Sequence, residues 1–166
     1  MDALDLVVAA IGVWLALGLL GLVRSRHLPY ISHVLFPVGG AVGLALAAVA
    51  LAAMDAPPQA LVLPLGLPDL PFHLRLDALS AFFLVLLGAT GAAVSVYSAG
   101  YFRASDGTAP GVVCCQYHAF LAAMALVLVA DDAYLFMVAW ETMALSSYFL
   151  VTTEHRIPEI RRAGFL

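Results

Sequence analysis

Residues 112–151 read VVCCQYHAFLAAMALVLVADDAYLFMVAWETMALSSYFLV and contain two long apolar runs separated only by Asp131 and Asp132. A helix rises about 1.5 Å per residue and the hydrocarbon core of a bilayer is about 30 Å thick, so about 20 mostly apolar residues cross it. The runs 112–130 and 133–151 meet or approach that length. Because the acidic turn between them is so short, we predict an antiparallel hairpin of two helices lying side by side.

The rest of the chain is similarly apolar. Hydrophobic residues make up 64% of the sequence and charged residues 11%, whereas soluble domains have about 45–50% apolar and about 25% charged residues. Three further runs have the length of a span, namely 6–23, 34–53 and 79–101. We therefore predict an all-α, polytopic transmembrane helical protein with five spans in a lipid bilayer. The net charge of −4 and the lack of a basic run exclude a nucleic-acid partner.

Residues 54–77, between the second and third predicted spans, follow a different pattern. From Leu61 to Asp77, apolar side chains recur at every second position on both sides of the turn sequence Gly-Leu-Pro-Asp at 66–69. A period of two is typical of β-strands, and the prolines restrict such strands to an edge. We predict a short β-hairpin outside the membrane.

The arginines indicate the orientation, because short cytoplasmic loops carry the excess of positive charge. If five spans alternate in direction, only Arg75 lies on one side of the membrane. The other six lie on the opposite side: Arg24, Arg26, Arg103, Arg156, Arg161 and Arg162. We therefore expect the N-terminus outside and residues 152–166 in the cytoplasm.

Glu141 is the residue that points most directly to a function. It lies near the centre of the run 133–151, where a charged side chain costs on the order of a few kcal/mol. In general, burial raises the proton affinity of a carboxylate and a nearby cation lowers it, so a neighbouring charge can switch its protonation. We interpret Glu141 as a proton-relay carboxylate, with Thr142, Ser146 and His118 as candidates for a supporting role. The alternative is a non-transporting structural or assembly protein whose glutamate only specifies helix packing.

Two histidines raise another alternative from the enzyme class. His33 and His118 both fall in or near predicted spans, so a haem-carrying quinol oxidoreductase with these axial ligands is conceivable. Histidines that hydrogen-bond or lie at an interface are far commoner. We expect no cofactor, no metal site and no catalytic centre in this chain.

Residues 130–150, ADDAYLFMVAWETMALSSYFL, resemble the fifth helix of a family of membrane subunits. These are the proton-pumping, antiporter-like subunits shared by respiratory complex I, Mrp sodium/proton antiporters and membrane-bound group 4 hydrogenases. The core W-E-x-M-x-L-x-S-Y carries the resemblance, because the glutamate is in register with the flanking Trp140 and Tyr148. Residues 74–83 (LRLDALSAFF), 153–156 (TEHR) and 161–166 (RRAGFL) look most like the branch of hydrogenase-4 component B and formate hydrogenlyase subunit 3.

The resemblance implies a role and a location. Glu141 would correspond to the family's helix-five glutamate, which pairs with a lysine on a later helix and takes part in proton translocation. The chain would be a non-redox subunit of an oxidoreductase complex in the bacterial inner membrane. Its partners would be other membrane subunits of a hydrogenase or complex I-like assembly. The resemblance also implies the same external N-terminus that the arginines indicate.

Lysine is absent from the chain, whose seven basic residues are all arginine. The expected partner of Glu141 is therefore missing. We expect the sequence to be an N-terminal fragment in which residues 152–166 begin a missing sixth helix. We also expect it to be unable to move protons alone.

Overall fold

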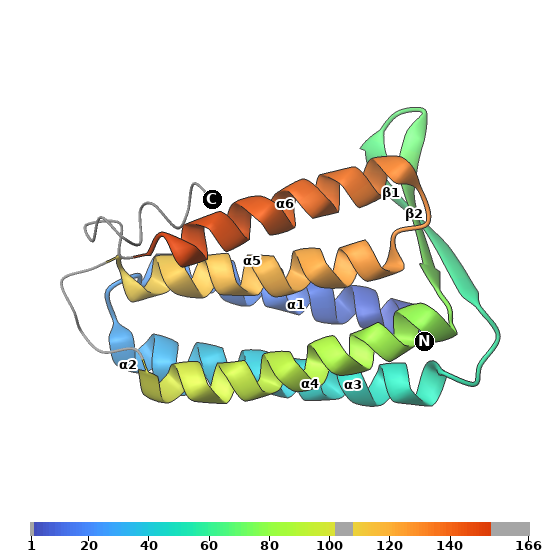
Figure 1. Cartoon of the computed structure of the whole chain (residues 1–166). Helices are drawn as coiled ribbons and strands as arrows, with labels where there is room; N and C mark the ends of the chain where they lie inside the picture. The colour runs from blue at the N-terminus through green and yellow to red at the C-terminus, as the bar shows by residue number, and fades with distance from the viewer. Residues whose placement is uncertain (1, 102–107, 154–166) are drawn as a thin grey trace.

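The computed structural model describes residues 2–101 and 108–153. Five long helices lie side by side, and a two-stranded hairpin crosses one end of the bundle (Figure 1). In chain order the elements are α1 (Ala3–Val23), α2 (Leu28–Tyr30), the π-helix η1 (Ile31–Leu35), α3 (Phe36–Ala53), β1 (Gln59–Leu67), β2 (Leu70–Leu76), α4 (Ala78–Tyr101), α5 (Pro110–Val129) and α6 (Ala133–Val151). The predicted fold class is confirmed, because the described chain contains five helices long and apolar enough to cross a membrane. The protein is a multi-pass membrane protein.

Capping groups and prolines set where the helices begin. Helix α1 begins at Ala3, before the predicted run 6–23, because the Asp5 carboxylate accepts a hydrogen bond from the backbone N–H of Asp2 at 3.0 Å. The second span begins at Leu28 rather than at 34, with Pro29 in its first turn, a position that proline tolerates well. Helix α6 ends at Val151. The sixth helix expected within 152–166 lies almost wholly outside the described residues.

Glycines allow two pairs of helices to pack closely. A Cβ on Gly88 of α4 would collide with the carbonyl oxygen of Gly43 on α3, and one on Gly111 of α5 would collide with that of Gly21 on α1. In a bilayer, helices associate through such close backbone approach rather than through the hydrophobic effect. The bundle is therefore built from the glycine-packed pairs α3–α4 and α1–α5.

The predicted β-hairpin is confirmed. Strands β1 and β2 pair in antiparallel register from Gln59↔Leu76 to Leu67↔Leu70, so that Pro68 and Asp69 form the turn. The pairing is irregular between Leu63 and Gly66, where Pro64 intervenes and cannot donate to the ladder. Gly66 has a φ of 113°, which glycine adopts readily.

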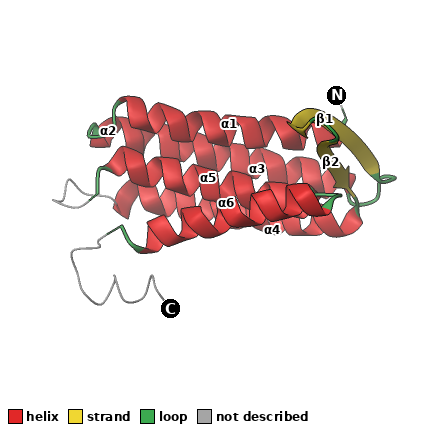
Figure 2. Cartoon of the chain, turned by 90° about the horizontal axis from the view of Figure 1, so that it is seen from above, coloured by secondary structure: helices red, strands yellow, loops and turns green. Residues whose placement is uncertain are grey.

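Helix α6 lies at the edge of the bundle, as seen in two views at right angles (Figures 1 and 2). It packs on α5 and touches β2 near its first residues. Only 17% of its span is buried within the chain, against 50% for α5. One side of α6 is therefore left uncovered by the described residues.

Candidate functional site

Glu141 lies on the uncovered side of α6. The buried residues of this helix are Leu135, Ala139 and Ser146, which form the stripe that faces α5. Glu141 follows Ala139 by two positions, which turns it about 200° around the helix axis, to the opposite side. Its side chain is accordingly exposed. The structure thus places a carboxylate in the middle of a span on a face that points away from the rest of the described chain.

An aromatic pair accompanies Glu141. The rings of Phe136 and Trp140 are stacked with centroids 5.6 Å apart, and both side chains are partly exposed. The two residues are four positions apart, the spacing that brings side chains together on a helix surface. They add apolar surface to the uncovered part of α6.

The two hydroxyl residues proposed to support Glu141 are hydrogen-bonded to their own helix. The Thr142 hydroxyl donates to the Val138 carbonyl at 2.8 Å, and the Ser146 hydroxyl donates to the Thr142 carbonyl at 2.8 Å. Such bonds to the preceding turn are routine for serine and threonine in helices. Thr142 is exposed beside Glu141, whereas Ser146 is buried toward α5. The structure leaves only Thr142 near the outward face.

His118 lies elsewhere, enclosed between helices. Its side chain is fully buried, and its Nδ1 is 2.9 Å from the carbonyl oxygen of Cys114. Because a carbonyl only accepts, Nδ1 carries the proton and Nε2 is left as an acceptor, which has no hydrogen-bond partner within the described chain. This nitrogen faces Gly39 of α3 so closely that a Cβ there would collide with it. A supporting role for His118 would have to act through the packing of α5 beneath α6.

The same geometry argues against the haem alternative. An axial ligand needs iron at its free ring nitrogen, and the space in front of Nε2 is filled by Gly39. His33 is exposed, and its Nδ1 lies 3.0 Å from the Ser32 hydroxyl and 3.2 Å from the Pro29 carbonyl. The two histidines are therefore not arranged as a ligand pair. Among the described residues, no group of three or more His, Cys, Asp or Glu could hold a metal ion.

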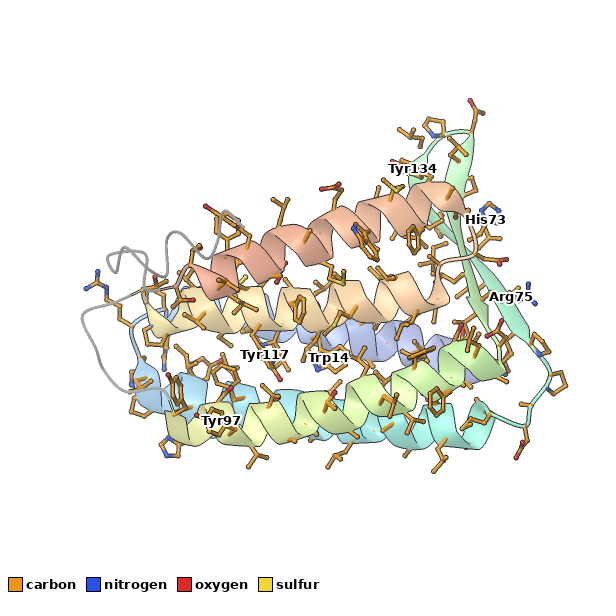
Figure 3. The ribbon with its side chains drawn as sticks, viewed as in Figure 1. Trp14, His73, Arg75, Tyr97, Tyr117 and Tyr134 are labelled. Atoms are coloured by element: carbon orange, nitrogen blue, oxygen red, sulfur yellow. The ribbon has the colours of Figure 1, made fainter. Side chains whose placement is uncertain are left out.

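Several polar contacts in the bundle interior were not predicted from the sequence. The indole N–H of Trp14 donates to the Gly39 carbonyl at 3.0 Å, and the Tyr117 hydroxyl donates to the Gly91 carbonyl at 2.8 Å. The Ser95 hydroxyl lies 3.0 Å from that of Tyr117. Figure 3 shows Trp14 and Tyr117 pointing into the middle of the bundle. A tryptophan or tyrosine within an apolar span was the available signal, since its polar atom needs a partner there.

A group of charged residues holds the hairpin to the turn between α5 and α6. The Asp132 carboxylate caps α6 by accepting from the Leu135 N–H at 2.7 Å, and it also accepts from the His73 N–H at 2.9 Å. Arg75 lies 3.9 Å from both Asp77 and Asp131. His73 and Arg75 project from β2 beside the start of α6 (Figure 3). This network fixes the first turn of α6 against the hairpin.

Hydrogen bonds determine the protonation of two of these carboxyl groups. The backbone N–H of Ser80 lowers the pKa of Asp77. Burial raises the pKa of Asp132, but the N–H groups of Leu135 and His73, together with the His73 ring, outweigh burial, and the net pKa lies below its usual value. Both groups are therefore negatively charged near neutral pH.

No protein-family model matches the chain, but several curated proteins are similar to it. Hydrogenase-4 component B of Escherichia coli is 35% identical over 162 residues, which cover 91% of this chain and 23% of that protein. NADH-quinone oxidoreductase subunit L of Mycobacterium tuberculosis is 36% identical over 102 residues, or 61% of this chain and 16% of that protein. The A1 subunit of the Na⁺/H⁺ antiporter of Staphylococcus aureus is 32% identical over 81 residues, or 49% of this chain and 10% of that protein.

The chain thus spans less than a quarter of the length of these curated relatives. All three relatives belong to the antiporter-like family of complex I. The helical fold, the hairpin and the three similarities agree with the resemblance of residues 130–150. The chain is accordingly a member of the antiporter-like family of membrane proteins that includes hydrogenase-4 component B, NADH-quinone oxidoreductase subunit L and the A1 subunit of the Na⁺/H⁺ antiporter.

Proposed function

We propose that the chain forms the N-terminal part of a proton-translocating subunit, with Glu141 as the proton-relay carboxylate in the middle of the membrane. The subunit would belong to a membrane-bound hydrogenase of the hydrogenase-4 or formate hydrogenlyase type, or to a related NADH-quinone oxidoreductase-like complex. The names of the relatives support this choice of assembly. The chain would itself carry no redox centre, and it would lie in the bacterial cell membrane with its N-terminus outside.

The position of Glu141 carries the proposal. A carboxylate exposed to hydrocarbon in mid-span is costly, and such groups almost always face protein or a water-filled cavity. In the described chain, Glu141 points away from the other helices and is exposed. We infer that other protein segments of the assembly cover this face of α6 and supply the environment of the carboxylate.

The relay also needs a cation near Glu141. An opposite charge within about 4–6 Å favours the charged form of a carboxylate, and its withdrawal favours the protonated form. The described arginines lie at the ends of the bundle, at Arg24, Arg26 and Arg75. We propose that the cation is a lysine on a helix outside this chain, as the family resemblance implies. Its approach and withdrawal would load and unload a proton at Glu141.

The competing function is structural. A protonated Glu141 that hydrogen-bonds to a neighbouring helix would specify packing without moving protons. The same uncovered face permits this, since either function requires a partner against α6. The two functions differ in what happens when the carboxyl group is replaced by an amide, which keeps hydrogen-bonding capacity but cannot ionise.

The substitution Glu141→Gln in the intact membrane assembly separates the two functions. Under the proposed function it abolishes coupled proton movement while the complex still assembles, because shape and hydrogen bonding are kept. Leu145→Ala is a control one helical turn away, since it changes an exposed side chain of α6 that carries no titratable or hydroxyl group. Proton uptake by membrane vesicles and the amount of assembled complex are measured together. Undiminished proton movement in Glu141→Gln would leave only the structural function.

The orientation is tested by labelling. With Cys114 and Cys115 replaced by serine, single cysteines are introduced by Ala3→Cys and Asp106→Cys. We expect a membrane-impermeant thiol reagent added outside intact cells to label residue 3 and to leave residue 106 unlabelled. Permeabilised cells, in which both sites should react, provide the control. Labelling of both residues, or of neither, in intact cells would contradict the proposed topology.

A further inference from the structure

Charged residues are unevenly divided between the two ends of the bundle. The described aspartates all lie at the hairpin end: Asp2, Asp5, Asp55, Asp69, Asp77, Asp131 and Asp132. Arg24 and Arg26 lie at the opposite end, between α1 and α2. Within residues 2–101 and 108–153 no carboxylate lies at that end, and neither arginine forms an ion pair. Two exposed guanidinium groups therefore lack an anion in the described chain.

The segment Arg24–His27, here called the basic turn, is held in a defined shape. The His27 N–H donates to the Arg24 carbonyl at 2.9 Å, and the Gly111 N–H of α5 donates to the Ser25 carbonyl at 2.8 Å. The Arg24 guanidinium lies over the Tyr30 ring, 6.0 Å from its centroid, a cation–π contact. The backbone that presents the two arginines is thus fixed before any ligand binds.

Apolar surface adjoins the basic turn. Leu19 and Val23, in the last turns of α1, are among the most exposed apolar residues of the chain, and Val23 is 77% exposed. They precede Arg24 on a helix that is long and apolar enough to cross the membrane. A ligand with an anionic head and an apolar tail would match both surfaces, whereas a free phosphate ion would match only the arginines.

We propose that the basic turn binds the phosphate group of an anionic phospholipid, with Arg24 and Arg26 as its ligands and acyl chains against Leu19 and Val23. Guanidinium groups bind phosphate oxygens through paired, charge-assisted hydrogen bonds. The two arginines lie at the end of the span formed by α1, which corresponds to the depth of lipid headgroups. This inference does not depend on the role of Glu141, and the test below would not be affected by failure of the relay.

The test uses the complete chain in phosphatidylcholine bilayers that contain increasing fractions of phosphatidylglycerol. A spin-labelled phosphatidylglycerol reports the lipid held by the protein. We expect selective retention of this lipid, and a loss of roughly five-fold in relative affinity for each arginine removed in Arg24→Gln and Arg26→Gln. Arg24→Lys with Arg26→Lys should retain part of the affinity, because charge is kept but paired hydrogen bonding is lost. Circular dichroism and thermal unfolding check that each variant is folded.

Arg75→Gln is the matched control, because it removes the same charge at the hairpin end, where carboxylates surround it. Retention equal to the wild type is expected for this variant. A loss as large as that of Arg24→Gln would show a general charge effect and overturn the site. Wild-type affinity in the double glutamine variant would also overturn it. Inorganic phosphate is added in a separate arm, and full displacement of the labelled lipid by it would show a phosphate-ion site instead.

Discussion

Helices α5 and α6 are neighbours in the chain and in space, yet the polar side chains in the middle of these two helices lie in opposite environments. On α5, His118 is fully enclosed, bonded through Nδ1 to its own helix and held against Gly39. On α6, Glu141 is exposed on the side away from α5. Polar residues in spans are costly in both places. The difference teaches that α5 encloses its polar residue and bonds one ring nitrogen within the chain, whereas the described residues leave the carboxyl group of α6 uncovered.

The enclosure of His118 can be tested by a substitution at Gly39. Gly39→Ala places a methyl group against Nε2 of His118, and overpacking of this kind typically lowers the free energy of unfolding by about 1–3 kcal/mol. Thermal and denaturant unfolding in detergent would measure it. Gly12→Ala is the control, because nothing lies within 4 Å of a Cβ there; it should stabilise by about 0.5–1 kcal/mol through helix propensity. Equal stability of the two variants would show that His118 is not tightly enclosed.

Removing the contact between α6 and the hairpin is expected to lower the free energy of unfolding by a smaller amount. Asp132→Ala removes the cap of α6 and the bond to the His73 N–H, and loss of a helix cap costs about 0.5–2 kcal/mol. Asp69→Ala, at the exposed tip of the hairpin, should leave stability unchanged. Unfolding curves at neutral pH would measure the free energy of unfolding of both variants.

The contacts of the Asp132 carboxylate also predict that the stability of the folded chain depends on pH. The pKa of Asp132 in the folded chain lies below its ordinary value, so its stabilising contribution is fully present above the unfolded pKa of about 3.9. It is lost as the pH falls through the lowered folded pKa. The stability difference between the wild type and Asp132→Ala should therefore shrink in strong acid. A difference that grows on acidification would contradict this assignment.

The smallest effect is expected where α6 is uncovered. In the isolated 166-residue chain, Glu141→Gln should change stability by less than about 0.5 kcal/mol, because exposed positions without contacts tolerate substitution. The wild-type chain in liposomes should pass no more protons or sodium ions than empty liposomes under an imposed pH gradient, since it contains no lysine and its described arginines lie at the bundle ends. Flux that is lost on Glu141→Gln would show that the five helices already contain a working path.

Much of the fold could be predicted because it depends on local patterns. Apolar run length predicted the helices, and the period of two between Leu61 and Leu76 predicted the hairpin, whose strands pair around Pro68 and Asp69. The short Asp131-Asp132 turn predicted that α5 and α6 are neighbours, and they do pack together. Each of these features is set by residues close in sequence. The mid-span position of Glu141 followed from counting along the same run.

The environment of the polar residues could not be predicted in the same way. A span is apolar on every side, so Leu135 and Ala139, which are buried, do not differ in character from Met137 and Leu145, which are exposed. With no contrast between faces, periodicity does not indicate which side of α6 meets α5. The sequence alone makes His118 a candidate haem ligand or supporting residue, and only the structure places Gly39 against its free nitrogen.

The sequence by itself determined that this is a five-span membrane protein with a hairpin and a carboxylate in the middle of its last described span, because length, hydropathy and alternation are properties of contiguous residues. Only the tertiary structure decided that His118 is enclosed, that Glu141 faces outward, and that Gly43 meets Gly88 while Gly21 meets Gly111. These features depend on which helices approach each other and at what rotation. In a uniformly apolar span, that choice is made by the fit between small residues on different helices, which no single stretch of sequence contains.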